Sequence, residues 1–348
     1  MNETTQPKLA LNGSRLFTSW LQQQNASLAF TTYQVGKLFL IGIKPDGGLS
    51  VFERTFDRAM GLTVTKERAY MGTLYQLWQL DNFLTAGEVH EGHDALYVPT
   101  VGTTTGDIDI HEMSVDGDGL PVFVATRFNC IASPAKRGSF KVRWKPSFID
   151  RVAAEDRCHL NGLAMQDGQP KYATCVSQTN VAEAWRAHRK DGGVVIDIDT
   201  DEVVAEGLSM PHSPRLYKDK LYLLQAGTGE FGYIDLKKKI FEPLCFLPGF
   251  ARGLSFCGDY AVIGLSKPRR EGTFEGLALN ERLEKEGIEA RCGLSIVNLK
   301  TGDVEHSLEI EGVIQELFDV AVIEGVRRPM ALGFRNEEIR FMVRPEED

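Results

Sequence analysis

The sequence returns to one β-rich pattern six times, and this recurrence constrains the fold more than any other feature. Each unit begins with small and apolar residues, continues through a second β-rich run and ends near an aspartate. In order along the chain, the units read SLAFTTYQVGKLFLIGI, MGLTVTKERAYMGTLYQLWQLD, GDIDIHEMSVDGDGLPVFVATRF, HLNGLAMQDGQPKYATCVSQ, MPHSPRLYKDKLYLLQAGTGEFGYID and ARGLSFCGDYAVIGLS. A period of roughly 30 to 60 residues is typical of repeat architectures.

Short polar turns separate the first two β-rich runs in four of these units. They are Lys66-Glu67, the turn at 166–168, Lys218-Asp219 and Gly258-Asp259. Such turns indicate antiparallel hairpins. We therefore expect an all-β fold, a closed β-propeller, in preference to a two-sheet sandwich or two separate β-domains. Six blades fit best, and a seventh would require the late run QELFDVAVI to begin a blade that the N-terminal strands complete.

Two segments depart from the β pattern. Residues 14–24 and residues 274–289 place apolar side chains at helical spacing. We expect an N-terminal helix that leads into the first strand, and a helical insertion in the last full blade that covers an end of the channel or a neighbouring subunit. The predicted organisation is a lead-in over 1–27, a propeller over 28–330 and a C-terminal tail over 331–348.

The composition indicates one large water-soluble domain. The chain has 348 residues, is 43% hydrophobic and carries a formal net charge of -9. Scattered lysines and arginines disfavour a nucleic-acid partner, and the lack of a run of about 18 apolar residues disfavours a membrane span. The N-terminus shows no secretion signal, and the six cysteines form no CxxC pair, so we expect reduced thiols and a cytoplasmic location. The sequence leaves a homo-oligomer open.

Three histidines occupy what read as equivalent places in successive units: His111 in GDIDIHEM, His159 in DRCHLNGLAM and His212 in MPHSPRLY. The innermost strands of a propeller line its channel, so the three imidazoles should meet in one pocket. Clustered imidazoles favour a divalent transition metal such as zinc, iron or copper. The alternative is that each histidine makes separate hydrogen bonds.

Other polar residues lie at the same unit starts. Asp109, Glu112 and Glu316 are candidate general acids or bases, although Glu112 alternates with His111 and should point to the opposite face of its strand. Candidate substrate-binding residues are Arg215, Arg252, Asn161 and Tyr33. Guanidinium groups at a channel mouth make forked contacts with anions, or else pair with neighbouring carboxylates.

These observations favour a metal-dependent enzyme that acts on a small anionic molecule in the central channel. A lyase, hydrolase, isomerase or oxidoreductase reaction would each suit the residues. The alternatives are a non-catalytic propeller that binds a ligand or a protein, and a metal-free lyase or epimerase with a histidine base. No glycine-rich phosphate loop is present, so we expect no nucleotide cofactor.

The runs TGDIDIHE, EDRCHLNGLAM, WRAHRKDGGVVIDID, MPHSPRLY, LPGFARGLSF and ELFDVAVIEGVRRP resemble those of a bacterial family of conserved proteins of unknown function that are predicted to be β-propellers. The run LNGLAM is also similar, more distantly, to gluconolactonase and regucalcin propellers, in which an Asn or Asp from each unit binds a divalent metal. That resemblance implies such a role for Asn161. His212 stands where the next unit would have an oxygen ligand, which shifts the preference from calcium toward a transition metal, whereas Arg252 in the unit after it would repel a metal from that side.

Overall fold

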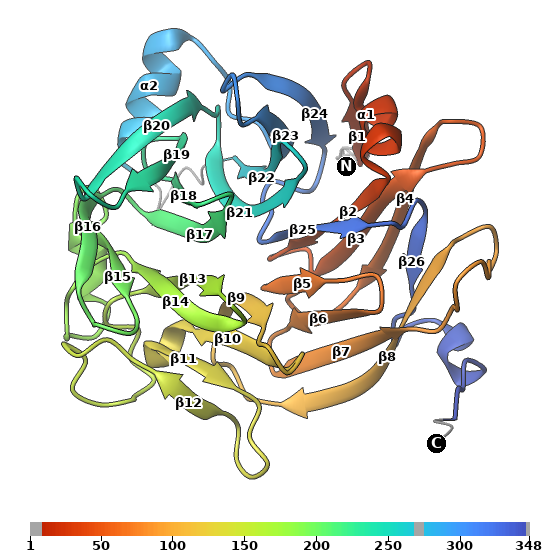
Figure 1. The fold of residues 1–348 in the computed structure, drawn as a ribbon, viewed down its shortest axis with the longest axis horizontal. Helices are drawn as coiled ribbons and strands as arrows, with labels where there is room; N and C mark the ends of the chain where they lie inside the picture. Colours follow the sequence, from red (N-terminus) through yellow and green to blue (C-terminus); the bar gives the residue numbers. More distant parts are fainter. Residues whose placement is uncertain (1–8, 268–274, 346–348) are drawn as a thin grey trace, which may run out of the picture.

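The chain is a ring of six largely antiparallel sheets around a central axis in a computed structural model that describes residues 9–267 and 275–345 (Figure 1). This arrangement confirms the predicted all-β propeller and its six blades. We number the blades from the one in which the two ends of the chain meet.

Each blade contributes its innermost strand to the axis and its last strands to the rim. From the axis outward, blade 1 contains β25 (Val320–Glu324), β2 (Ala26–Thr32), β3 (Lys37–Ile43) and β4 (Leu49–Thr55), and blade 2 contains β5 (Leu62–Val64), β6 (Arg68–Gly72), β7 (Gln76–Asn82), β8 (Ala95–Thr104) and β26 (Pro329–Ala331). Blade 3 contains β9 (Ile110–Val115), β10 (Pro121–Ala125), β11 (Cys130–Ser133) and β12 (Lys141–Trp144), and blade 4 contains β13 (Leu160–Gln166), β14 (Gln169–Cys175), β15 (Gly193–Asp197) and β16 (Val203–Leu208). Blade 5 contains β17 (Pro211–Tyr217), β18 (Lys220–Gln225), β19 (Glu230–Asp235) and β20 (Ile240–Phe246), and blade 6 contains β21 (Phe250–Cys257), β22 (Tyr260–Ser266), β23 (Gly293–Asn298), β24 (Val304–Glu311) and β1 (Ala10–Gly13).

Blade 1 closes the ring with strands from both ends of the chain. Strand β25 pairs antiparallel with β2, from Ala26 opposite Glu324 to Phe30 opposite Val320. The run QELFDVAVI therefore supplies the missing inner strand of blade 1 and adds no seventh blade. The first unit in the sequence begins with a second strand, so Tyr33 does not belong to an inner strand as its position in the repeat had suggested.

The four predicted polar turns connect inner to second strands in blades 2, 4, 5 and 6. In two of them both central residues have positive φ, 49° and 74° at Asp167-Gly168 and 47° and 63° at Lys218-Asp219. This conformation matches the right-handed twist of the flanking strands and suits Asp and Gly. The residues of these turns therefore determine where the first hairpin lies in each of the four blades.

Apolar side chains fill the interfaces between neighbouring blades. Each of the six interfaces holds its own buried cluster, for example the stacked Phe30 and Phe39 between blades 1 and 6. Burial of such side chains contributes roughly 1.5–3 kcal/mol each. The cysteines are free thiols, as predicted, and Cys158 is fully buried. Stability is therefore spread around the ring.

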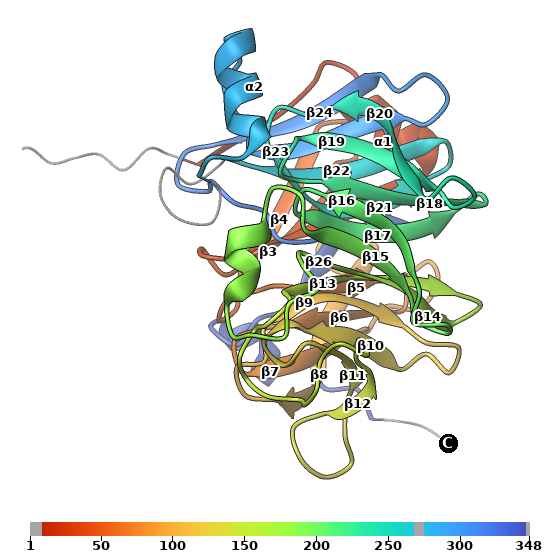
Figure 2. The same ribbon diagram turned by 90° about the vertical axis from the view of Figure 1, so that its left-hand side faces the viewer.

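Two α-helices and three short 3₁₀ turns complete the described residues. Helix α1 (Phe17–Gln24) buries Phe17, Trp20 and Leu21 against blades 1 and 6. Helix α2 (Ala278–Glu286) is inserted between β22 and β23 of blade 6, as predicted, and projects from one face of the ring (Figure 2). The 3₁₀ turns are η1 (Thr126–Phe128), η2 (Ala184–His188) and η3 (Glu337–Arg340). Phe274, part of the predicted second helix, lies outside the described residues.

Helix α2 belongs to the end of the ring at which the histidines lie. Its Leu279 and Leu283 pack in one buried cluster with Trp185, Met210 and Phe250, which also line the central pocket. None of the helices among residues 9–267 and 275–345 is long and apolar enough to span a membrane.

Candidate functional site

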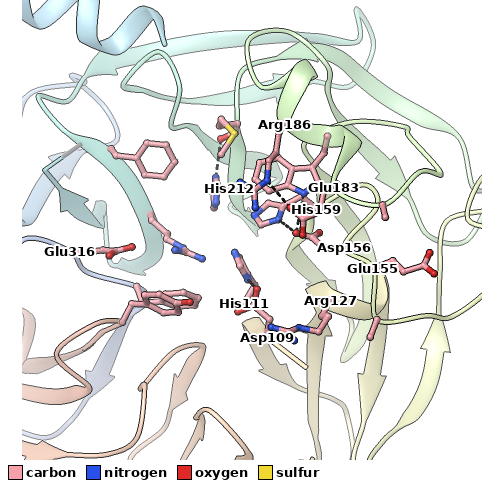
Figure 3. A pocket seen from close by; sticks show the side chains of 18 residues that line it. Asp109, His111, Arg127, Glu155, Asp156, His159, Glu183, Arg186, His212 and Glu316 are labelled. Atoms are coloured by element: carbon pink, nitrogen blue, oxygen red, sulfur yellow. Dashed lines mark hydrogen bonds and ion pairs between the residues drawn. The ribbon is translucent and has the colours of Figure 1, made fainter. Parts of the chain in front are cut away.

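A cavity of about 550 Å³ opens near the ring axis, and its walls come from five of the six blades and the loops between them. Figure 3 shows that His111, His159 and His212 lie around the same opening, with Asp109 and Glu316 at its sides. This volume lies within the roughly 300–1,000 Å³ of small-molecule sites. Tyr33 and Arg252 also line the cavity, so most of the predicted site residues meet there.

The three imidazoles are neighbours. The ring centroid of His111 lies 4.9 Å from that of His159 and 6.4 Å from that of His212. Their places in the repeats differ, however, because His111 and His212 are the second residues of β9 and β17, whereas His159 directly precedes β13. The residue equivalent to His111 and His212 is Asn161, and His159 corresponds to Asp109. The prediction of three equivalent histidines is wrong in this respect, while their convergence is confirmed.

His159 is held by an acidic partner and an aromatic wall. Its Nδ1 lies 2.9 Å from Oδ2 of Asp156, and its ring stacks on Trp185 with centroids 4.1 Å apart. The indole N–H of Trp185 donates to the same Asp156 oxygen over 3.0 Å. Nδ1 of His159 therefore carries a proton and donates it to Asp156, which leaves Nε2 with a lone pair. This is the arrangement of an oriented general base.

His111 and His212 are buried in a positive field. Burial, followed by the positive charge of Arg252, lowers the pKa of His111 to about 4 and the pKa of His212 well below its ordinary value. Nδ1 of His212 donates to the carbonyl oxygen of Met210 over 2.9 Å, and its Nε2 lies 3.4 Å from Nδ2 of Asn161. Both imidazoles are thus neutral at neutral pH.

Arg252 is a buried cation without a close partner. Only 9% of its surface is exposed, and its guanidinium carbon lies 3.5 Å from the ring centroid of Phe318. Its Nη2 atom is buried without a hydrogen bond from the part of the chain that the structure describes, and no ion pair joins it to a described carboxylate. Burial lowers its pKa, while Glu316 and Asp109 favour its charged form from a longer range. Burying an unpaired guanidinium is costly, and an anion at this wall of the pocket would offset that cost.

Three predicted residues lie outside the pocket lining, where they connect blades. The Glu112 carboxylate pairs with Arg215, and its Oε2 accepts a hydrogen bond from the backbone N–H of Leu163 over 2.8 Å. Arg215 also donates to the carbonyl oxygen of Leu163. Asn161 accepts a hydrogen bond from Thr174 Oγ1 over 2.8 Å and reaches the site only through His212. The structure therefore gives Glu112 and Arg215 a bridging role, since the side chain of Glu112 leaves the strand on the face opposite His111.

Several site residues were missed by reasoning from the sequence. Asp156 lies in the loop before β13, and Trp185 lies in the segment after β14. Phe318 lies under the guanidinium of Arg252, and its ring also stacks on that of Tyr33 with centroids 5.4 Å apart. Asp156 lies three residues before His159, which is a usable signal for an Asp–His pair. Nothing in the repeat pattern points to Trp185.

No three His, Cys, Asp or Glu side chains in residues 9–267 and 275–345 are grouped so that they could hold one metal ion. The positive charge of Arg252 acts on both His111 and His212 and would repel a dication from that side. The donor set therefore suits a metal less well than the sequence had suggested.

Two solved structures with TM-scores above 0.5 share this fold. A chain from the crystal structure of a nidogen/laminin complex has a TM-score of 0.52 and 10% identity, covering 86% of this chain and 99% of that chain. A protein of unknown function from Bacteroides caccae has a TM-score of 0.51 and 11% identity over the same shares. Virginiamycin B lyase from Staphylococcus aureus has a TM-score of 0.39 and 10% identity, covering 87% of this chain and 99% of that chain.

No curated protein matches the sequence at a significant level. A family model does match, under the description "Domain of unknown function (DUF4915)", and it extends over residues 15–332. These residues include every strand of the six blades except β1, and every side chain of the pocket described above. The chain therefore belongs to this family of unknown function.

Proposed function

We propose that the central pocket binds a small molecule through a carboxylate and transfers a proton to or from it. The observation that carries this proposal is Arg252, a guanidinium that is nine-tenths buried, without an ion pair to a described residue, at the wall of a cavity of small-molecule size. A carboxylate in the pocket would supply the forked hydrogen bonds that Arg252 lacks.

The Asp156–His159 pair would carry out the chemistry. The C–H or O–H bond next to the substrate carboxylate breaks, its proton passes to Nε2 of His159, and the electron pair that stays on the substrate is stabilised by Arg252. Asp156 keeps the imidazole in the correct tautomer and stabilises the imidazolium that forms. Neutral His111 and His212 complete the wall without adding positive charge.

Replacing Arg252 tests the binding half of the proposal. A panel of small carboxylates and their neutral amides, followed by thermal shift and calorimetry, identifies a ligand. Arg252→Lys and Arg252→Met should weaken the carboxylate by roughly 10- to 100-fold and leave the amide unchanged, since a charge-assisted hydrogen bond contributes about 1.5–3 kcal/mol. Arg215→Lys is the matched control and should keep wild-type affinity. Equal losses for acid and amide would contradict the proposal.

Replacing His159 tests the catalytic half. His159→Gln should retain the carboxylate ligand but lose proton exchange at the substrate by about 10²- to 10⁴-fold, measured as deuterium incorporation from heavy water. Exchange at the wild-type rate would show that His159 is not the base.

A second candidate function keeps the predicted transition metal, and the closeness of the three imidazole rings favours it. Binding a metal would require Nε2 of His212 to exchange its contact with Asn161 for the ion. Elemental analysis of untagged protein purified without chelator decides between the two: stoichiometric zinc, iron or copper that is lost in His111→Gln supports the metal.

A further inference from the structure

The pocket holds a second charge without a hydrogen-bonding partner, and its sign is opposite to that of Arg252. The carboxylate of Asp109 lies 3.4 Å from Nδ1 of His111. This contact lacks hydrogen-bond geometry, and Nδ1 of His111 has no hydrogen bond to any other described residue. No other described side chain or backbone N–H donates to the Asp109 carboxylate. Burial would by itself raise the pKa of Asp109, yet the nearby imidazoles and Arg252 lower it, so the group is ionised.

The remaining rim charges are already neutralised within the protein. Arg127 pairs with Asp107 over 2.9 Å, and Arg186 pairs with Glu183 over 2.6 Å. Glu155 is bound by Arg151 and Arg157. A ligand therefore gains little by approaching these groups, whereas Arg252 and Asp109 each lack a hydrogen bond from the part of the chain that the structure describes.

Arg252 and Asp109 lie on either side of one aromatic wall. Arg252 covers the ring of Phe318, the Phe318 centroid lies 5.2 Å from that of His111, and His111 contacts Asp109. Each charge acts on the other through space, but no ion pair joins them. The space between them is part of the cavity that both residues line.

From this juxtaposition we infer that the substrate is a zwitterion, a free amino acid whose carboxylate binds Arg252 and whose ammonium group binds Asp109. The inference rests on the proposed carboxylate site and names its substrate class. A simple carboxylate would satisfy Arg252 but would bring a second negative charge toward Asp109, which costs free energy in a partly buried site. A simple amine would satisfy Asp109 and meet the repulsion of Arg252. A molecule with both charges avoids both penalties.

The zwitterion inference is tested by ligands that differ in one charge. Calorimetry on the full-length protein uses the twenty common amino acids. Glycine, β-alanine and γ-aminobutyrate form a series in which the distance between ammonium and carboxylate increases. For each ligand, the acid without the ammonium group and the amine without the carboxylate serve as matched probes. At least one amino acid should bind about 10-fold or more tightly than both of its matched probes.

Two variants then assign the two ends of the ligand. Asp109→Asn should weaken binding of the amino acid and strengthen binding of the matched acid, so that the two bind alike. Arg252→Met should likewise weaken binding of the amino acid and strengthen binding of the matched amine. Glu53→Gln, which removes a surface carboxylate in blade 1, is the charge-matched control, and melting temperatures verify that each variant is folded.

The outcomes separate this inference from the proposed function. If an acid binds as tightly as its amino acid and Asp109→Asn changes neither affinity, the zwitterion inference is wrong while the carboxylate site stands. If no carboxylate-bearing probe binds in an Arg252-dependent way, both are wrong.

Discussion

At the scale of single residues, the site is built on backbone conformations that most side chains avoid. Asp109, His159 and Met210 have φ values of 58°, 50° and 48°, and each directly precedes the inner strand of blade 3, 4 or 5. A non-glycine residue in this region is uncommon, and such strain tends to gather at functional sites. Asp109 and His159 could be singled out from the sequence by their chemistry. Their positive φ could not be predicted, because only a glycine signals such a conformation clearly in a sequence, and neither residue is a glycine.

The buried imidazole of His111 gives a pH dependence of known sign. Its pKa is lowered from 6.5 to about 4, so between these values the unfolded chain binds a proton that the native protein does not. The contribution of His111 to stability is therefore fully present above pH 6.5 and is lost as the pH falls toward 4. The loss should reach about 3 kcal/mol. Because other groups titrate in this range, the measurement is the difference in unfolding free energy between wild type and His111→Gln in urea from pH 7 to pH 4.

Exposed His188 provides the control for this titration. His188→Gln should follow the wild-type curve across the whole range. A constant difference between wild type and His111→Gln would show that His111 titrates alike in the folded and unfolded chains.

At the scale of elements, polar side chains on inner strands, or directly before them, connect neighbouring blades through backbone N–H groups. Glu112 accepts from Leu163, Asp319 accepts from Leu62 over 2.8 Å, and Ser213 accepts from Gly253 over 3.1 Å. These contacts join blade 3 to 4, blade 1 to 2 and blade 5 to 6. Burial, followed by the charge of Glu112, raises the pKa of Asp319 to about 7, which places these carboxylates in one electrostatic network.

Removing one partner of the Glu112–Arg215 ion pair should lower the free energy of unfolding more than removing both partners. Glu112→Met leaves the Leu163 N–H without its acceptor and Arg215 without its counter-ion, so we expect a loss of about 2–4 kcal/mol in the free energy of unfolding. The double variant Glu112→Met with Arg215→Met should recover part of that loss. Denaturant unfolding of the three variants gives the comparison, and a double variant as unstable as the sum of the single variants would refute the bridging role.

Most of the fold, and part of the site, could be predicted from the sequence. The blades follow from local signals, since turns such as Lys218-Asp219 and alternating apolar strands depend on neighbouring residues alone. The convergence of His111 and His212 follows from the repeat. The support of His159 by Asp156 and Trp185 could not be predicted, because these residues come from loops of irregular shape. The bridging role of Glu112 depends on a contact with the next blade, which no local pattern encodes.

At the scale of the whole molecule, the ring is closed by the pairing of β25 with β2, and the C-terminal segment supports blade 2 beyond that point. Strand β26 pairs in parallel with β8, and Ile339 and Met342 pack on Leu96 and Val98. The closing strand and the outer segment are separate in the chain, so their contributions can be separated by truncation.

Truncation before residue 315 should prevent a stable ring, because it removes β25 and exposes the apolar faces of blades 1 and 6. Truncation after Gly333 keeps β26 and removes Ile339 and Met342, so it should lower the melting temperature by several degrees while keeping the cooperative transition. Circular dichroism and calorimetry measure both effects. A cooperative, wild-type-like transition in the shorter chain would mean that closure by β25 is not required for the fold.

The closure in blade 1 also determines when the pocket is completed during synthesis. Glu316 and Phe318, which directly precede β25, line the pocket, and Phe318 supports Arg252. Translation delivers this segment after the histidines and Arg252 have been synthesised. A growing chain, or one terminated before this segment, therefore presents its imidazoles without a finished pocket.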